Sequence, residues 1–250
     1  MQANDIAVIT GASRGIGAAT AILAAERGYR VCVNYLNNQS AAENVVQKIN
    51  SRGGEAFAVG ADVSSEAGVM NLFESVDKQP GDLAALVNNA GILQQQMRVD
   101  MMNAERVNRV MRTNVTGCFI CAREAVKRMS TSLGGKGGAI VNVSSAASRL
   151  GGPGEYVDYA ASKGAVDSLT IGLAAEVAGE GIRVNAVRPG IIYTDIHASG
   201  GEPGRVDRVK SGVPMKRGGQ PEEVAEAILW LLSDAASYST GSFIEVSGGR

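Results

Sequence analysis

The sequence is poor in the residues that most often carry metal and redox chemistry. It contains one histidine, His197, and three cysteines among 250 residues. A lone loop histidine is more often a surface residue than a catalyst, and no second ligand lies near it, so a metal site is unsupported. Cys118 and Cys121 match a C-x-x-C spacing inside an apolar helical stretch, without a second ligand pair. We interpret both thiols as core residues of a helix, and not as a redox pair.

Strong net charge and long apolar segments are also missing. The formal net charge is -1, and the lysines and arginines are scattered, which gives no electrostatic footprint for nucleic acid. No apolar run reaches the roughly 18 residues needed to span a bilayer. Residues 1–5 carry no basic head and no cleavage site. We therefore expect a cytoplasmic protein that binds neither nucleic acid nor membranes.

The residues that are present indicate one α/β domain over residues 1–250. This length can bury a large core, and the 32 glycines cluster at strand ends without a fixed period. Predicted strands alternate with predicted helices, which implies right-handed crossovers and a ligand site at the carboxyl ends of parallel strands. We predict a Rossmann-like doubly wound parallel sheet of about seven strands, with helices on both faces. The predicted strands are 5–10, 31–34, 55–59, 83–87, 139–143, 182–187 and 242–246, and the predicted helices include 18–26, 41–52, 103–112, 114–129, 165–177 and 221–232.

A glycine turn follows the first predicted strand and precedes a helix. Glycines let the backbone approach a pyrophosphate, and the helix N-terminus offers free N–H groups, so this turn is predicted to bind a dinucleotide. A tight βα turn that needs glycine for shape alone is the alternative. The predicted contacts are Gly11, Ser13, Arg14, Gly15, Ile16 and Gly17.

The end of the second predicted strand bears on the choice of cofactor. Asn34 and Tyr35 should lie near the adenosine ribose, and no acidic residue follows them until Glu43. Without a carboxylate to repel a 2′-phosphate, and with Arg14 to pair with one, NADP(H) is favoured over NAD(H). Arg14 could also be a solvated loop residue. Beyond the third strand, Asp62 either binds the adenine amino group or caps the next helix, and Val63 lies beside it.

Tyr159 and Lys163 form a Y-x-x-x-K run, and the residues after it indicate a helix. Two helical residues four apart share one face, about 6 Å apart along the axis. A free tyrosine titrates near pH 10, and a fixed positive charge beside it favours the phenolate. Tyr159 could then give a proton to a carbonyl oxygen, or take one back from an alcohol. Tyr156 lies about 10 Å from Lys163 along a helix, so it is the poorer candidate.

Six motifs in order make the chain similar to the short-chain dehydrogenase/reductase (SDR) family, in its single-domain form of about 250 residues. The resemblance covers nearly the whole chain and extends to uncharacterised bacterial oxidoreductases and glucose-dehydrogenase-like members. It also implies a homotetramer. The motifs are T-G-x-x-x-G-x-G at 10–17, N-N-A-G at 88–91, asparagine at 114, serines at 144 and 145, Y-x-x-x-K at 159–163, and proline-glycine at 189–190.

The resemblance implies roles for several residues. Asn114 is expected to hold a water that links Lys163 to solvent and renews the proton of Tyr159, although by type it could be a helix cap. Lys163 is also expected to hold the nicotinamide ribose. Small residues at 88–91 keep a strand end open beside the glycine turn, and the 188–194 turn would hold the nicotinamide end, unless proline and glycine only shape it. The residues expected to contact the cofactor here are Asn89, Ala90, Gly91, Pro189, Gly190, Ile192 and Thr194.

The active serine needs a choice between Ser144 and Ser145. A hydroxyl at this strand end can donate to a substrate carbonyl and stabilise negative charge. In the family the serine usually stands thirteen residues before the tyrosine, a position that Ala146 occupies here. One extra residue within 150–158, a glycine-rich loop, would explain the offset. We predict Ser145, with Ser144 as the alternative.

These features together predict an oxidoreductase that uses NADP(H) to interconvert a carbonyl compound (ketone, aldehyde or sugar) and an alcohol by hydride transfer. The glycine-rich segment 195–214 should form a lid over a small-molecule substrate, and residues 94–98 and 149–156 should also line the pocket. A sugar-nucleotide epimerase or dehydratase shares Y-x-x-x-K, but resembles T-G-x-x-G-x-x-G and has a longer C-terminal domain. A non-catalytic NADP(H) sensor has no need of Tyr159. The predicted catalytic residues are Asn114, Ser145, Tyr159 and Lys163.

Overall fold

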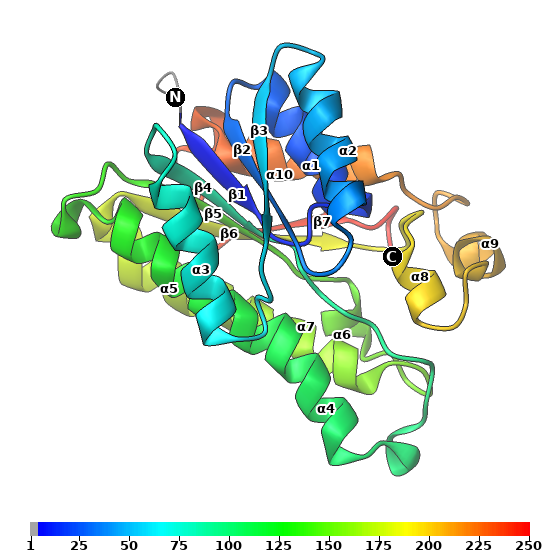
Figure 1. Ribbon diagram of the computed structural model, residues 1–250. Helices are drawn as coiled ribbons and strands as arrows, with labels where there is room; N and C mark the ends of the chain where they lie inside the picture. Colours follow the sequence, from blue (N-terminus) through cyan, green and yellow to red (C-terminus); the bar gives the residue numbers. More distant parts are fainter. Residues whose placement is uncertain (1–4) are drawn as a thin grey trace.

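The computed structural model describes residues 5–250 and has a parallel β-sheet at its centre (Figure 1). Within this range the sheet has seven strands in the order β3-β2-β1-β4-β5-β6-β7, and every neighbouring pair is parallel. The predicted Rossmann-like α/β fold is therefore confirmed. Residues 1–4, part of the segment considered for targeting, lie outside the described residues. The strands are β1 (Ile6–Ile9), β2 (Arg30–Tyr35), β3 (Glu55–Gly60), β4 (Leu83–Asn88), β5 (Gly138–Val143), β6 (Ile182–Pro189) and β7 (Phe243–Val246).

Helices cover both faces of the sheet because side chains alternate along each buried strand. In β1, Ala7 and Ile9 pack into a cluster with α1, α2 and α10. Ile6 and Val8 pack into the opposite cluster with α3, α5 and α7. The two clusters together form the core and fix the sheet between its helical layers. These helices are α1 (Gly15–Glu26), α2 (Gln39–Asn50), α3 (Glu66–Asp77), α5 (Gly117–Met129), α7 (Val157–Val177) and α10 (Pro221–Leu232).

The predicted helices 103–112 and 114–129 form one continuous helical run. The helix α4 (Ala104–Met111) passes through a π-helical turn, Arg112–Thr116, directly into α5. Asn114 lies in this turn and is fully buried. The alternative in which Asn114 caps a helix was therefore wrong, because the residue lies inside a helical run and its side chain faces the protein.

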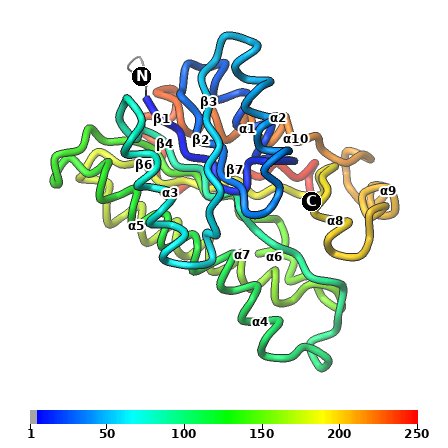
Figure 2. Tube along the Cα trace, in the orientation of Figure 1, coloured from blue at the N-terminus to red at the C-terminus, as the bar shows by residue number. Residues whose placement is uncertain are grey.

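The predicted loop 195–214 is not free of regular structure. It contains α8 (Ile196–Ser199), α9 (Arg205–Val209) and a 3-10 turn, Lys210–Gly212. Another short helix, α6 (Ala147–Leu150), lies before α7, and a 3-10 turn, Val99–Met101, lies before α4. Helices this short do not complete the periodic pattern by which sequence reveals a helix. The C-terminus of the chain lies beside α8 (Figure 2).

The strand order places a crevice at one edge of the sheet. The strand β1 lies between β2 and β4. The chain passes from β1 to β2 and β3 on one side and then crosses to β4 on the other side, so the strand order reverses at β1. In open α/β sheets, ligands bind at the carboxyl ends of strands at such a point. Within residues 5–250, no helix is both long and apolar enough to cross a lipid bilayer.

Candidate active site

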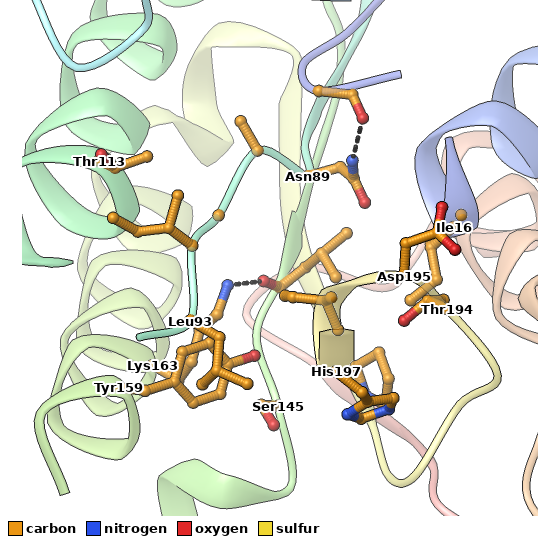
Figure 3. A pocket seen from close by; sticks show the side chains of 18 of the residues that line it. Ile16, Asn89, Leu93, Thr113, Ser145, Tyr159, Lys163, Thr194, Asp195 and His197 are labelled. Atoms are coloured by element: carbon orange, nitrogen blue, oxygen red, sulfur yellow. Dashed lines mark hydrogen bonds between the residues drawn. The ribbon is translucent and has the colours of Figure 1, made fainter. Parts of the chain in front are cut away.

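A cavity of about 1160 Å³ opens at the carboxyl ends of the strands (Figure 3). Residues that follow β1, β4 and β5 line it, together with the turn after β6 and the α8 segment. Its volume exceeds the roughly 300–1000 Å³ of a typical ligand pocket, which leaves room for a dinucleotide and a small substrate. Of the predicted site residues, all except Gly17 and Asn114 line the cavity.

The glycine turn brings bare backbone to the cavity wall. Gly11 has φ +63°, and a Cβ there would lie 3.0 Å from the Cα of Ala90. Gly15 also has a positive φ, and Arg14 at the N-cap of α1 makes no side-chain capping bond. The first N–H groups of α1 therefore lack a side-chain acceptor, as in helix N-termini that bind phosphate. The turn fits a pyrophosphate group.

Two asparagines brace this turn from behind. The Nδ2 of Asn89 donates to the carbonyl of Gly11 at 3.1 Å, and the backbone N–H of Gly11 donates to the Oδ1 of Asn34 at 3.2 Å. The Nδ2 of Asn34 donates in turn to backbone carbonyls at the end of β3. A Cβ at Gly17 would lie 2.5 Å from the Nδ2 of Asn89. Asn34 and Gly17 thus shape the turn with buried contacts, and Gly17 does not face the cavity.

The glycine turn carries a cation on the cavity wall. Arg14 is exposed there and forms no ion pair with any residue of the described chain, while Asn37 and Asn38 lie nearby on the wall. The Oδ1 of Asp62 accepts the N–H of Ser64 at 2.8 Å. The N-cap of α3 is Ser65, whose Oγ accepts the N–H of Gly68, so the alternative in which Asp62 caps this helix was wrong.

Tyr159 and Lys163 project together from the first turns of α7, as the spacing predicted (Figure 3). The Nζ of Lys163 lies 5.7 Å from the centre of the Tyr159 ring and donates a 2.7 Å hydrogen bond to the carbonyl of Val143. Lys163 is buried, whereas Tyr159 is half-buried and lines the cavity. Tyr156 is buried instead, and its hydroxyl lies 3.4 Å from the carbonyl of Gly200.

The two serines at the end of β5 have different surroundings. The buried hydroxyl of Ser144 donates to the Oδ1 of Asp167 at 2.6 Å and lies 3.2 Å from the carbonyl of Lys163. The Oγ of Ser145 accepts the N–H of Ala147 at 3.1 Å, which leaves its own proton free to donate. Ser145 lies beside Tyr159 on the cavity wall (Figure 3). The geometry therefore favours Ser145 for contact with a ligand.

Asn114 joins three parts of the site without facing the cavity. Its Oδ1 accepts the N–H of Ile92 at 2.8 Å, and its Nδ2 donates to the carbonyl of Ile92 and to the Oγ of Ser162, each at 3.1 Å. Gly91 leaves the space beside it open, since a Cβ there would lie 3.5 Å from both Asn114 and Lys163. Asn114 thus holds the β4 exit against α7.

The turn after β6 closes the cavity from the other side. The N–H of Gly190 donates to Val246 of β7 at 2.9 Å, and the N–H of Ser144 donates to Val187 of β6. Thr194 approaches the glycine turn, because a Cβ on Gly15 would lie 3.3 Å from its methyl group. The predicted contacts at 189, 190, 192 and 194 therefore meet the glycine turn across one cavity.

Charged residues hold the segment 195–214 against the loop before α7. Arg205 pairs with Glu155 at 2.5 Å and with Glu202 at 3.3 Å, and its guanidinium lies 4.9 Å from the centre of the Tyr156 ring. The hydrogen bond from Arg205 lowers the pKa of the Glu155 carboxyl. Arg208 also binds Glu202, and the Nε2 of Gln96, in the segment after β4, donates to the Oε2 of Glu202. Several partly buried ion pairs thus hold the segment 195–214 against the loop before α7.

His197 lies on the inner side of this segment. Only 8% of it is exposed, and it lines the cavity, so the expectation of a surface histidine was wrong. No sequence pattern indicated this burial, because α8 has four residues and is too short to show an apolar face. Other lining residues that the prediction missed include Leu36, Asn37, Asn38, Ala61, Ile92, Leu93, Arg109, Thr113 and Arg250. Arg250 reaches the cavity only because the chain end folds back to it.

The cysteines are core residues, as predicted. Cys118 and Cys121 are free and buried on α5, and burial raises the pKa of both thiols above the ordinary value. A thiol in this environment is a weak nucleophile. Among residues 5–250, no three His, Cys, Asp or Glu side chains gather into a group that could hold a metal ion.

The comparison with known proteins agrees with this geometry. A family profile described as Enoyl-(Acyl carrier protein) reductase matches residues 11–250. The chain belongs to the short-chain dehydrogenase/reductase family. Among curated SDR proteins, the uncharacterized oxidoreductase YgfF of Escherichia coli (strain K12) is 65% identical over 245 residues, which cover 98% of this chain and 99% of the relative.

Two further relatives are named for an enzymatic activity. The 3-oxoacyl-(acyl-carrier-protein) reductase FabG of Staphylococcus aureus (strain Mu50) is 39% identical over 249 residues, 100% of this chain and 99% of the relative. The crystal structure of a candidate gluconate dehydrogenase from Agrobacterium tumefaciens matches with a TM-score of 0.89 and 36% identity, covering 98% of this chain and 95% of that one. The chain is thus an SDR oxidoreductase homologous to FabG.

Proposed function

We propose that this SDR protein is an NADP(H)-dependent oxidoreductase that interconverts a carbonyl compound and an alcohol, and that it works as a homotetramer. The proposed reaction is supported by the pairing of Tyr159 with Lys163 on the wall of a cavity that the glycine turn also lines. One cavity then offers a proton donor, a cation beside it and a place for a dinucleotide. Relatives named as a 3-oxoacyl-(acyl-carrier-protein) reductase and a candidate gluconate dehydrogenase agree with this reaction class.

The proposed proton transfer follows from the positions of the side chains. A bound nicotinamide cofactor supplies the hydride in reduction and accepts it in oxidation. The hydroxyl of Ser145 orients the substrate carbonyl, and Tyr159 gives its proton to the carbonyl oxygen, which becomes the alcohol hydroxyl. Lys163 stabilises the phenolate that remains. In the reverse direction, the phenolate takes the proton from the alcohol.

The cofactor preference rests on the adenosine end of the cavity. The glycine turn and the open N-terminus of α1 fit the pyrophosphate, and Arg14 fits a 2′-phosphate as a charge-assisted partner. Asn34 and Tyr35, the residues that end β2, carry no charge to repel this phosphate. The residues present therefore suit NADP(H) better than NAD(H).

The reaction is tested by a screen of ketones, aldehydes, sugars and alcohols with NADPH or NADP⁺, followed by absorbance. Tyr159→Phe should lose at least about a hundredfold in turnover, because it removes the general acid. It should still bind NADPH, which is measured by fluorescence titration. Tyr238→Phe, at a fully exposed position, is the matched control and should keep parental turnover. Parental turnover in Tyr159→Phe would refute the mechanism.

The cofactor preference has its own test. Arg14→Ala should raise the KM for NADPH about tenfold or more and change the KM for NADH little, because a hydrogen-bonded charge pair contributes about 1.5–3 kcal/mol. Lys48→Ala removes an exposed cation from the neighbouring helix α2 and serves as the control. An equal rise for both cofactors would contradict pairing of Arg14 with a 2′-phosphate.

A further inference from the structure

His197 is a buried polar residue that the proposed chemistry leaves unused. It lies on α8, is 8% exposed and lines the cavity. Figure 3 places it across the cavity from Tyr159, with Ser145 between them. A substrate held at its reacting carbon by Tyr159 and Ser145 would therefore extend toward the side of the cavity that His197 occupies.

The tautomer of His197 follows from one contact. Its Nε2 lies 2.9 Å from the backbone carbonyl of Ile192. A carbonyl oxygen can only accept a hydrogen bond, so Nε2 must carry the proton and act as donor. Burial lowers the pKa of the imidazole below its ordinary value, which keeps the ring neutral at pH 7. The Nδ1 atom then carries a bare lone pair.

This Nδ1 atom has no partner. It is buried, and no donor from residues 5–250 reaches it. Burying an acceptor without a hydrogen bond costs free energy, so such groups are rare in folded proteins. Two charged residues of the same segment that act on the imidazole, Arg205 and Glu202, form ion pairs with each other, and Arg205 also pairs with Glu155. The missing donor must therefore come from outside the described chain.

We propose that the Nδ1 atom of His197 accepts a hydrogen bond from a hydroxyl group of the substrate. The inference rests on the proposed function and deepens it, since it assigns a substrate class. This class consists of carbonyl compounds that carry a hydroxyl group away from the reacting carbon, and of the corresponding diols. A carboxylate cannot donate and would be repelled by the lone pair. His197 then determines specificity, while Tyr159 and Ser145 act on the reacting oxygen.

A site built to bind a hydroxyl rejects ligands that lack one, because the buried acceptor is then left unpaired. The proposal therefore predicts discrimination between molecules of equal size. The test compounds are methyl ketones that end in a hydroxyl group, from hydroxyacetone to 5-hydroxy-2-pentanone. Each is compared with the ketone in which a methyl group replaces that hydroxyl.

Nuclear magnetic resonance can observe the proposed bond directly, because the chain contains one histidine. With ¹⁵N-labelled histidine, the free protein at pH 7 should show a protonated Nε2 and an unprotonated Nδ1. Adding NADP⁺ and a hydroxy ketone should move the Nδ1 resonance toward its hydrogen-bonded position, whereas the methyl-ended partner should not. A protonated Nδ1 in the free protein, or an unmoved resonance at saturating hydroxy ketone, would overturn the proposal.

Substitutions provide an independent measurement. His197→Gln keeps an amide N–H that can donate to Ile192 but places no acceptor at the position of Nδ1, so kcat/KM should fall about tenfold for hydroxy ketones and stay within about twofold for methyl-ended ones. His197→Phe removes both bonds and should show the same selectivity loss if it folds. Ser211→Ala, at an exposed position of the same segment, is the control. Equal losses on both ketone series would show a structural role only and refute the inference.

The two proposals fail in different ways. The resonances of His197 are read without turnover, so a normal histidine response with no reduction of any ketone would refute the reaction and leave the binding site intact. Conversely, turnover that depends on Tyr159 without any effect of the second hydroxyl would refute the substrate class alone. A shift of the Nδ1 resonance by an amide-bearing acyl thioester, and not by any hydroxy ketone, would also refute the hydroxyl class.

Discussion

Ser144 and Ser145 are adjacent hydroxyls whose surroundings give them separate tasks. Ser144 is bonded to Asp167 inside the protein, and Ser145 keeps a free proton at the cavity. We expect Ser145→Ala to lower kcat about a hundredfold, since oxyanion donors have effects of that order. We expect Ser144→Ala to lower the free energy of unfolding by about 1–3 kcal/mol, because it removes a buried partner of Asp167.

The measurement is a comparison of the two alanine variants by steady-state kinetics and urea unfolding. The alanines differ only in position, so each variant is the control for the other. The expected pattern is a kinetic defect in Ser145→Ala and a stability defect in Ser144→Ala. The reverse pattern would assign the substrate contact to Ser144.

At the residue scale, the sequence predicted the pairing of Tyr159 with Lys163 better than the contacts that shape the cavity around them. Tyr159 and Lys163 could be paired because four residues make about one helical turn, a local property. The bonds of Asn34 to Gly11 and to the end of β3 join three segments far apart in the chain. The burial of His197 likewise depends on how α8 packs. Such contacts are set by tertiary structure, and no local pattern encodes them.

At the scale of elements, a buried ion pair fixes the start of α7. The Nε of Arg106 on α4 donates to the Oδ2 of Asp158 at 2.7 Å, and their side chains are 10% and 2% exposed. The Oδ1 of Asp158 accepts the N–H of Tyr159, and Arg106 also donates to the carbonyl of Gln95 in the segment after β4. One guanidinium thus links the helix that carries Tyr159 to the segment after β4.

We therefore predict that Arg106→Gln destabilises the protein by about 3–5 kcal/mol, because it leaves the Asp158 carboxylate buried without a positively charged partner. The double variant Arg106→Gln with Asp158→Asn should recover part of this loss, since no charge then remains buried. Urea unfolding measures the stability, and kcat reports whether Tyr159 is displaced. Arg98→Gln, an exposed arginine, is the control. A double variant less stable than both single variants would contradict this coupling.

Strands and helices long enough to show a periodic pattern of apolar residues could be predicted from the sequence. The π-helical turn and the short helices could not. The seven strands and the helices α2 and α10 lie close to their predicted ranges. The π-helical turn at 112–116 was missed, because one added residue per turn leaves the local composition unchanged. The short helices of the 195–214 segment were missed because its glycines and polar residues resemble a loop.

At the scale of the whole molecule, two ion pairs make stability depend on pH. The hydrogen bond from Arg208 lowers the pKa of Glu202 to about 2, and that from Arg217 lowers the pKa of Glu223 to about 2, from an ordinary value of 4.5. A depressed carboxyl pKa adds stability that is complete above about pH 4.5 and is lost as pH falls toward 2. Glu202 joins the 195–214 segment to Gln96, so this segment should loosen in acid.

The contribution of Glu202 and Glu223 to the free energy of unfolding should be constant between pH 5 and 7. It should decrease as the pH falls below 4.5. Urea unfolding at fixed ionic strength between pH 3 and 7 measures it. Glu223→Gln should reduce stability at pH 7 and flatten the decline in acid. Glu105→Gln changes an exposed carboxyl on α4 and should leave the curve unchanged. An equal acid decline in Glu223→Gln would remove this residue from the explanation.

The proposed homotetramer accounts for apolar side chains that the single chain leaves in water. Phe119 on α5 is 50% exposed and Ile171 on α7 is 57% exposed, and α5 and α7 cover the same face of the sheet. Around Ile171, the small residues Gly172 and Ala175 are also exposed, so another helix can approach closely. Apolar exposure of this kind is typical of faces buried by a second subunit.

Ile171→Asp should therefore split the assembly, because a carboxylate at the centre of an apolar interface is buried without a partner. Light scattering after size-exclusion chromatography should give a mass near four chains for the parent and a smaller mass for this variant, with the fold retained by circular dichroism. Leu133→Asp places the same charge on a residue that is 64% exposed outside these two helices, and should leave the mass unchanged. A parent with the mass of one chain would show that Phe119 and Ile171 face water, and the proposed assembly would be wrong.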